Sequence, residues 1–195
     1  MVRESEVKRQ TAETNISVYL NIDGTGKGKV STEIGFFDHM LNLWCKHGGF
    51  DLELYAQGDL CVDCHHTVED VGICLGKAVK QALGDKAGIT RYGQAFVPMD
   101  EALALAVVDF SGRGFLEMDA HFPSKQVGEF DTELVEEFLR ALAVNGEFTL
   151  HVRLLSGKNT HHIIEAIFKA LGRAMRQAAE QDPKITGIPS TKGVL

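Results

Sequence analysis

The chain has 195 residues, of which 44% are hydrophobic and 24% are charged, an ordinary composition for one globular domain or two small fused ones. Its formal net charge of -7 argues against general nucleic-acid binding but leaves room for a local basic pocket. No stretch approaches about 18 consecutive apolar residues, and no apolar run follows the charged N-terminus. We therefore expect no membrane partner, no secretory signal and a cytoplasmic location.

Helical and strand-like patterns alternate along the chain. Helical periodicity appears in segments 37–47, 65–83, 131–144 and 161–180. Residues 48–58 and 146–157, which follow the first and third of these segments, alternate apolar and polar side chains as half-buried strands do. The stretch DGTGKGK, residues 23–29, lacks a Walker pattern and a following helix, so we interpret it as a hairpin turn.

The two halves of the chain carry the same pattern in the same register. His39 lies 9 residues before Gly48, and Glu137 lies 9 residues before Gly146. This repeat predicts an internal duplication, with halves at about 1–92 and 93–195. Each half is expected to form an antiparallel sheet with two helices over one face, an α+β arrangement in which the halves pack together through their helices.

An HHxxE motif stands at the start of one predicted helix in each half. The motifs are His65, His66 and Glu69, then His161, His162 and Glu165. Either histidine of a motif can share a metal ion with the glutamate, but adjacent histidines point about 100° apart, so one ion is not expected to bind both. One such motif alone is more often a pair of solvated histidines.

Two copies at matched positions favour metal binding, because each copy also has a further ligand-capable residue upstream, His39 or Glu137. The sequence therefore predicts two metal sites, each drawing on more than one motif. Mn, Fe, Zn and Ni all suit imidazoles with one or two carboxylates, and the sequence does not choose among them.

Residues that could hold an anion are scattered, and each alone is more often a solvated surface group. Lys169 lies one helical turn beyond Glu165, so its ammonium could reach a ligand at the metal. The tail PSTKGVL offers hydroxyl, backbone N–H and ammonium donors, which commonly hold phosphate. The candidates are Arg91, Arg113, Lys169, Ser190 and Lys192.

Four cysteines are expected to be free thiols, because disulfides are rare in intracellular proteins. Cys61 and Cys64 form a single CxxC with no second copy. A strand-to-helix turn is the favoured interpretation, and a cysteine-ligated zinc site is the less favoured alternative.

The chain contains, in this order, the motifs FFDHMLNLWCKHGGFDL, DCHHTVEDVGICLG, PMDEALA, SGRG, GKNTHHIIEAIFKALGRAMRQA and PSTKGVL. On these motifs, and from about Arg9 to Leu195, the chain resembles the imidazoleglycerol-phosphate dehydratases. The resemblance implies a duplicated β-β-α-β unit with helices packed between two sheets. It also implies a homo-oligomer of 24 subunits built from trimers, with two Mn²⁺ ions in each active site at subunit contacts.

The resemblance also assigns roles to residues of this chain. It implies Glu13 as the catalytic acid or base, and it places Arg91, Arg113, Lys169, Ser190 and Lys192 on phosphate-binding positions. The implied metal ligands are His39, His65, His66, Glu69, Glu137, His161, His162 and Glu165. Glu137 stands where other members have histidine, and we keep it as a ligand because carboxylates also bind Mn²⁺. Leu43 stands where other members often have glutamine near the substrate.

The implied reaction is the dehydration of D-erythro-imidazole-glycerol phosphate to imidazole-acetol phosphate in histidine biosynthesis. It would proceed through a substrate imidazolate bound by the two ions. Two alternatives stay open: a metal-dependent hydrolase and a non-catalytic metal-binding shell protein. A hydrolase would place solvent oxygen in its product. A shell protein catalyses no reaction, so Glu13→Gln would have no effect on turnover.

Overall fold

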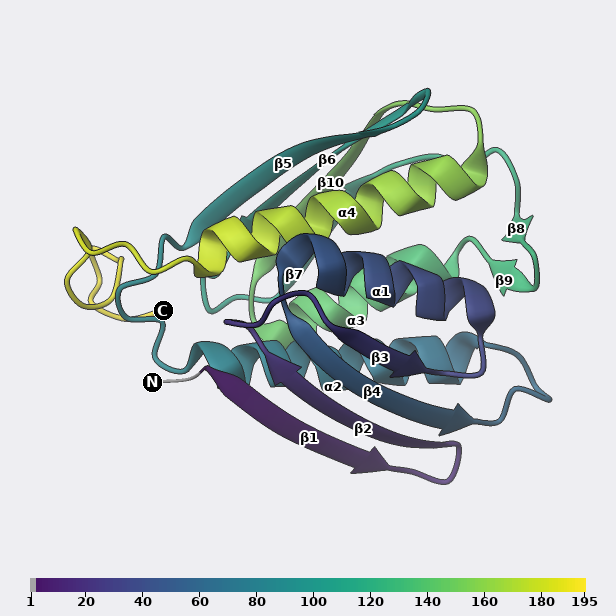
Figure 1. Cartoon of the computed structure of the whole chain (residues 1–195), viewed down its shortest axis with the longest axis horizontal. Helices are drawn as coiled ribbons and strands as arrows, with labels where there is room; N and C mark the ends of the chain where they lie inside the picture. The colour runs from purple at the N-terminus through teal and green to yellow at the C-terminus, as the bar shows by residue number, and fades with distance from the viewer. Residues whose placement is uncertain (1–2) are drawn as a thin grey trace.

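Four helices lie between two four-stranded sheets in the computed structural model, which describes residues 3–195 (Figure 1). The elements of the first half are β1 (Glu4–Gln10), β2 (Thr14–Asn21), β3 (Gly28–Ser31), α1 (Gly35–Gly48), β4 (Asp51–Gly58) and α2 (His65–Leu83). Those of the second half are β5 (Tyr92–Met99), β6 (Ala102–Asp109), β7 (Phe115–Asp119), β8 (Gln126–Val127), β9 (Phe130–Asp131), α3 (Leu134–Gly146), β10 (Thr149–Ser156) and α4 (Thr160–Ala179).

The two sheets have the same strand order, β1-β2-β4-β3 and β5-β6-β10-β7, which confirms the predicted duplication of the fold. Each sheet is mixed, however, rather than purely antiparallel as expected. The pairs β3–β4 and β7–β10 are parallel. The reason is that a helix connects the two strands of each pair, and such a crossover returns the chain in its original direction.

Alternating side chains place one face of each sheet against the helices. Ile16, Val18 and Leu20 of β2 are buried, and so are Leu52 and Leu54 of β4. The strands after α1 and α3 begin a few residues later than predicted, because the helices continue to the glycines that precede them. The helix expected from residue 131 begins at 134, because residues 130–131 belong to the short strand β9.

The stretch DGTGKGK is not a hairpin turn, which corrects the interpretation from sequence. It connects β2 to β3, and β4 lies between these two strands in the sheet. The Asp51 carboxylate holds this connection by accepting hydrogen bonds from the backbone N–H groups of Thr25 and Lys27, at 2.8 and 2.9 Å. The Asp51 side chain therefore holds this connection, because β2 and β3 do not pair with each other as the strands of a hairpin would.

The helices pack in pairs that join the two halves, α1 against α4 and α2 against α3, as predicted. Glycine permits the close approach in each pair. A Cβ at Gly76 of α2 would lie 2.6 Å from the backbone oxygen of Leu142, and one at Gly172 of α4 would lie 2.5 Å from that of Trp44. These glycines occupy matching positions of the two repeats, so the duplication extends to the helix contacts.

Among residues 3–195, the structure has no helix that combines the length and apolar character needed to span a membrane.

Candidate functional site

The contact between α1 and α4 brings three ligand-type side chains together. His39 comes from α1, and His161 and Glu165 stand one turn apart at the start of α4. One donor atom from each residue lies within 4.8 Å of the other two. Glu165 Oε2 is 3.2 Å from His161 Nε2 and 3.8 Å from His39 Nε2. Two imidazoles and a carboxylate that converge in this way suit a divalent transition metal.

Glu165 is kept ionised at this cluster although it is only 7% exposed. Its burial opposes ionisation, but the hydrogen bond and positive charge of Lys169, with smaller contributions from His39 and His161, outweigh that effect and lower the pKa of Glu165. Lys169 Nζ also lies 3.5 Å from Met99 Sδ. Lys169 therefore lies at this cluster, as its spacing from Glu165 predicted.

His66, at the start of α2, faces two carboxylates. Its Nδ1 lies 3.1 and 3.2 Å from the two oxygens of Asp59, and 3.8 Å from Glu13 Oε2. The hydrogen bond to Asp59 is the main reason that the pKa of His66 is raised. Because an ionised carboxylate only accepts hydrogen bonds, Nδ1 is the donor and the neutral ring keeps its lone pair on Nε2.

His162, at the matching position of α4, has one close carboxylate partner. Glu101 Oε2 lies 2.7 Å from His162 Nδ1, and Glu101 Oε1 accepts the backbone N–H groups of Lys158 and Asn159 at 3.1 and 2.7 Å. The hydrogen bonds, led by the one from His162, lower the pKa of Glu101 to about 2. Asp59 and Glu101 were both missed as site residues by the sequence reasoning, although Glu101 stands 11 residues before Gly112 as Glu13 stands 11 before Gly24.

Three other predicted ligands, His65, Glu69 and Glu137, do not form a second such cluster among the described residues. All three are half-buried; His65 and Glu69 belong to α2, and Glu137 belongs to α3, the helix that packs against it. Within residues 3–195, the cluster at His39 is the one place where three ligand-type side chains lie within 4.8 Å of one another. The structure therefore brings three of the eight predicted metal ligands together and does not gather the other five into a second cluster of this kind.

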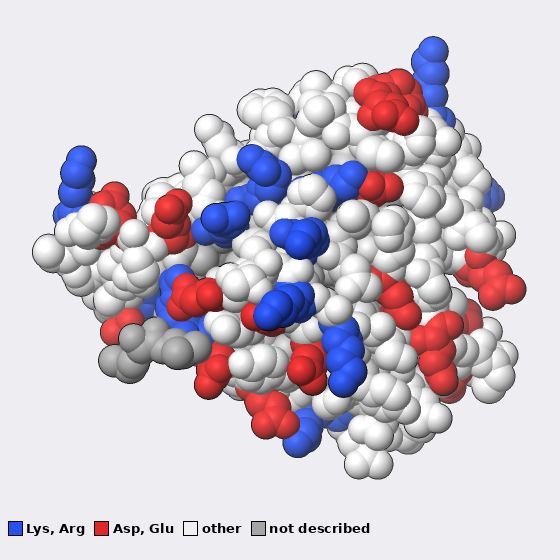
Figure 2. Space-filling model, viewed as in Figure 1, with Lys and Arg blue, Asp and Glu red and all other residues white. Residues whose placement is uncertain are grey.

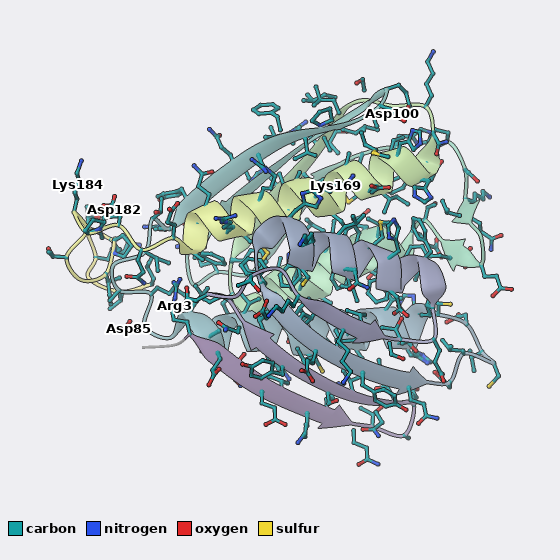
Figure 3. The ribbon with its side chains drawn as sticks, viewed as in Figure 1. Arg3, Asp85, Asp100, Lys169, Asp182 and Lys184 are labelled. Carbon is teal, nitrogen blue, oxygen red and sulfur yellow. The ribbon has the colours of Figure 1, made fainter. Side chains whose placement is uncertain are left out.

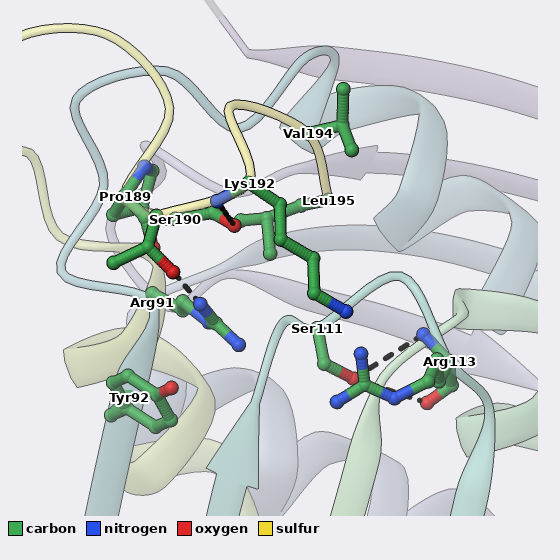
Figure 4. A pocket seen from close by; sticks show the side chains of 10 residues that line it. Arg91, Tyr92, Ser111, Arg113, Pro189, Ser190, Lys192, Val194 and Leu195 are labelled. Atoms are coloured by element: carbon green, nitrogen blue, oxygen red, sulfur yellow. Dashed lines mark hydrogen bonds between the residues drawn. The ribbon is translucent and has the colours of Figure 1, made fainter.

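Four of the five predicted anion-holding residues line one cavity of about 670 Å³ beside the C-terminal tail. Arg91, Arg113 and Lys192 extend toward the same space (Figure 4), and Ser190 also lines it. Asp109 fixes Arg91 through two hydrogen bonds of 2.7 and 3.2 Å to Nε and Nη2. Arg91 Nη1 also donates to the backbone oxygen of Pro189 at 2.9 Å, which ties the tail to the cavity.

The cavity and the ligand cluster lie at opposite ends of α4. The backbone N–H of Arg91 donates to the oxygen of Ala178 at the C-terminal end of this helix, whereas His161 stands at its start. His161 and Ala178 are 17 residues apart in the helix, which is a rise of about 25 Å along its axis. Figure 3 places Lys169 between them, partway along the helix and away from the tail. The fifth predicted anion-holding residue is thus with the ligand cluster rather than in the cavity.

One face of this acidic chain is locally basic. Figure 2 shows Lys and Arg side chains gathered over α1 and α4, with acidic groups mostly toward the edges of the view. His47 lies on this face, and its pKa is lowered by burial and then by the positive charges of Lys169 and Arg173. Positive charge therefore lies along α4 close to Lys169, which favours the approach of an anion.

Comparison with known proteins gives one consistent result. The family model described as imidazoleglycerol-phosphate dehydratase matches residues 32–175. The imidazoleglycerol-phosphate dehydratase of Desulforamulus reducens is 63% identical over 193 residues, covering 99% of this chain and 98% of the relative. That of Acetivibrio thermocellus is 60% identical over 195 residues, with both chains covered completely.

Two solved structures are also similar to this chain. The imidazoleglycerol-phosphate dehydratase of Staphylococcus aureus has a TM-score of 0.81 and 43% identity, covering 91% of this chain and 99% of its own. The structure from Pyrococcus furiosus in complex with (S)-C348 has a TM-score of 0.84 and 39% identity, covering 97% of this chain and 100% of its own.

Proposed function

The chain belongs to the imidazoleglycerol-phosphate dehydratase family, and on that premise we propose that it converts D-erythro-imidazole-glycerol phosphate to imidazole-acetol phosphate in histidine biosynthesis. This makes the enzyme a hydro-lyase, which sets aside the hydrolase and shell-protein alternatives. The structural observation that carries the proposal is the convergence of His39, His161 and Glu165 in a chain that also carries a basic cavity.

We propose that the cluster of His39, His161 and Glu165 holds one of two Mn²⁺ ions in each active site. Its donor set fits a divalent cation of this kind, because two imidazoles and an ionised carboxylate converge. The second ion would draw on the set His65, Glu69 and Glu137, with His66 and His162 as further ligands. When bound, the ions would supply Lewis acidity that stabilises negative charge on the substrate's imidazole ring.

Glu13 is the residue that we propose moves the proton. Dehydration requires removal of a carbon-bound proton and protonation of a departing hydroxyl, and one well-placed carboxylate can typically contribute about 10²–10⁴-fold to such a step. The Glu13 side chain is 55% exposed and stands 3.8 Å from His66, so it is open to a substrate near the metal ligands. Glu101, in contrast, is engaged in three hydrogen bonds.

Asp59 and Glu101 keep two of the proposed ligands in a binding form. Each accepts a hydrogen bond from Nδ1 of its histidine, which leaves Nε2 free as a donor atom toward a metal. In the basic cavity, the guanidinium groups of Arg91 and Arg113 and the ammonium of Lys192 suit the phosphate of the substrate. We also propose a cytoplasmic location, because a phosphorylated substrate does not cross membranes freely.

The separation of about 25 Å between cluster and cavity supports an active site shared between subunits. A substrate as small as imidazole-glycerol phosphate cannot reach both places in one chain, so a neighbouring copy has to supply one of them. The cluster also offers three protein ligands, whereas Mn²⁺ prefers about six. Both facts support a site completed by a neighbouring copy, and for the assembly we propose the homo-oligomer of 24 subunits built from trimers that the family resemblance implies.

Conversion of the substrate by the purified protein tests this function. We expect the wild-type protein with Mn²⁺ to give a product that has lost one water, identified by mass spectrometry and phosphorus NMR. His161→Ala should reduce turnover by at least about 10²-fold, because it removes a ligand of the cluster. Absence of the dehydrated product with folded, metal-loaded wild-type protein would refute the proposal.

A further inference from the structure

The turn between β1 and β2, which carries Glu13, is closed by a side chain. Thr11, Ala12 and Glu13 connect the two strands, and none of them has the positive φ that tight hairpins usually require. The Thr11 hydroxyl instead accepts the backbone N–H groups of Glu13 and Thr14, at 3.1 and 2.9 Å. The position of Glu13 therefore depends on where Thr11 and Thr14 are held.

Asp70 of α2 fastens this hairpin to the helix that carries His66. It is only 7% exposed, and its two oxygens accept hydrogen bonds from Arg9 Nε at 2.9 Å and Thr14 Oγ1 at 2.5 Å. The Thr14 hydroxyl lies 3.2 Å from that of Thr11. Arg9 and Thr14 stand on the two strands that flank the turn, so one carboxylate holds both sides of it.

Asp70 also stands four residues after His66, one turn along the same face of α2. The helix face that presents His66 to Glu13 thus holds the base of the Glu13 hairpin as well. Because helix, strands and turn are joined through a buried carboxylate, the distance between Glu13 and His66 is set by this contact rather than by the flexible glutamate side chain alone.

The second half of the chain lacks this contact, although its hairpin has the same register. Arg9 pairs with Ile16 in the first sheet, and Val97 pairs with Ala104 at the matching place in the second. The residues that match Arg9, Thr14 and Asp70 are the buried, apolar Val97, Ala102 and Ala166. That hairpin closes with a positive φ of 48° at Asp100, and its glutamate, Glu101, is fixed directly by His162. The first half, in which the Glu13 side chain has no hydrogen-bond partner among the described residues, therefore has the buried polar contact, and the second half, in which His162 holds Glu101, lacks it.

We propose that Asp70, acting through Thr14 and Thr11, is a positioning residue that sets Glu13 over the reacting part of the substrate. The inference rests on the proposed function, because it takes Glu13 as the proton-transferring group. A displacement of about 1 Å at such a group can lower the rate roughly 10²-fold, so a loosened turn should reduce kcat while substrate binding is preserved.

The test compares Thr14→Val, which removes the hydroxyl at nearly constant shape, with Thr14→Ser, which keeps it. In the Mn²⁺-loaded enzyme, we expect Thr14→Val to lower kcat about tenfold with less than about a twofold change in KM, and Thr14→Ser to restore most of the rate. Asp70→Asn should lower kcat at least as much. Bound metal, measured by mass spectrometry, should stay unchanged in all three variants.

Ser5→Ala is the matched control. Ser5 Oγ donates to the backbone oxygen of Ala78 at 2.8 Å, a buried hydrogen bond between β1 and α2 at the end of the strand away from Glu13. We expect Ser5→Ala to lower the melting temperature to a similar extent as Thr14→Val but to leave kcat unchanged. An equal loss of kcat in Ser5→Ala would show that general loosening is responsible and would overturn the inference.

A Glu13→Gln background separates the inference from the proposed function. If Thr14 acts through Glu13, adding Thr14→Val to Glu13→Gln should lower kcat by less than about twofold further. The same tenfold loss in both backgrounds, or an unchanged kcat in Thr14→Val alone, would overturn the positioning role while Glu13 keeps its own. If Glu13→Gln itself turns over at the wild-type rate, the proposed role of Glu13 fails, and the positioning role fails with it.

Discussion

At the scale of single residues, the carboxylates nearest the predicted histidine ligands act in three ways. Glu165 points into the ligand cluster, Asp59 and Glu101 hold histidines by Nδ1, and Glu13 remains free beside His66. The difference lies in the partners. Glu165 is charge-balanced by Lys169, Glu101 is saturated with hydrogen bonds, and Glu13 has neither kind of partner at hydrogen-bond distance within the described residues.

Removing the histidine-holding carboxylates should weaken metal binding. Asp59→Ala and Glu101→Ala are each expected to lower the affinity for Mn²⁺ about 10–100-fold, because the ring of His66 or His162 loses its fixed orientation and tautomer. Titration of Mn²⁺ into metal-free protein measures the effect. Glu136→Ala is the control, since this glutamate makes only an exposed helix pair with Arg140. If Asp59→Ala and Glu101→Ala bind Mn²⁺ as tightly as Glu136→Ala does, these carboxylates do not hold the histidines for metal binding.

Much of the ligand cluster could be predicted from the sequence, and the carboxylates around it could not. The HHxxE spacing identified His161 and Glu165 because helix geometry relates residues four apart. Asp59 contacts His66 across a loop, and no periodic pattern records such a contact. Leu43, where the resemblance led us to consider a missing polar contact, packs half-buried against the hydrophobic core.

At the scale of elements, the helices were predictable because their periodicity is strong, and their exact contacts were not. The sequence shows Gly76 and Gly172 as helix positions but does not show that a carbonyl oxygen of the partner helix lies 2.6 or 2.5 Å from an added Cβ. The connection DGTGKGK was misread for a related reason. Turn composition marks where the chain bends, while the sheet order decides which strand it then joins.

Alanine at these two glycines should destabilise the fold. Gly76→Ala and Gly172→Ala are each expected to lower the free energy of unfolding by about 1–3 kcal/mol, because the helix pair has to move apart, against a gain in helix propensity of about 1 kcal/mol. Denaturant unfolding at fixed protein concentration measures the change. Gly35→Ala, in the first turn of α1 with no atom within 4 Å of an added Cβ, should be neutral or stabilising. If Gly76→Ala and Gly172→Ala are both as stable as Gly35→Ala, the close packing of the two helix pairs is refuted.

At the scale of the whole molecule, the repeat in the sequence predicted the duplicated fold, and the comparisons confirm the family resemblance. The sequence could not show the parallel strand pairs, which depend on how each crossover helix returns to its sheet. It also could not show that the cavity and the ligand cluster lie at opposite ends of α4. That distance supports the proposal that a neighbouring copy of the chain completes the active site.

Mixed oligomers should recover activity that neither parent has. His161→Ala damages the ligand cluster and Arg113→Gln damages the basic cavity, so each variant alone should be nearly inactive. After co-expression, about a quarter of the sites should combine an intact cluster from one chain with an intact cavity from another, and activity should rise to about a quarter of wild type. Turnover of the co-purified oligomers measures this. Activity no higher than that of the parents would contradict a site shared between subunits.

The most direct test of the central claim is turnover of imidazole-glycerol phosphate by metal-free protein before and after addition of Mn²⁺. We expect no measurable dehydration without metal and full recovery of imidazole-acetol phosphate formation when Mn²⁺ is restored, with the His161→Ala variant failing to recover. Dehydration at an undiminished rate by protein verified to be free of metal would contradict the claim, because the cluster of His39, His161 and Glu165 would then have no part in the reaction.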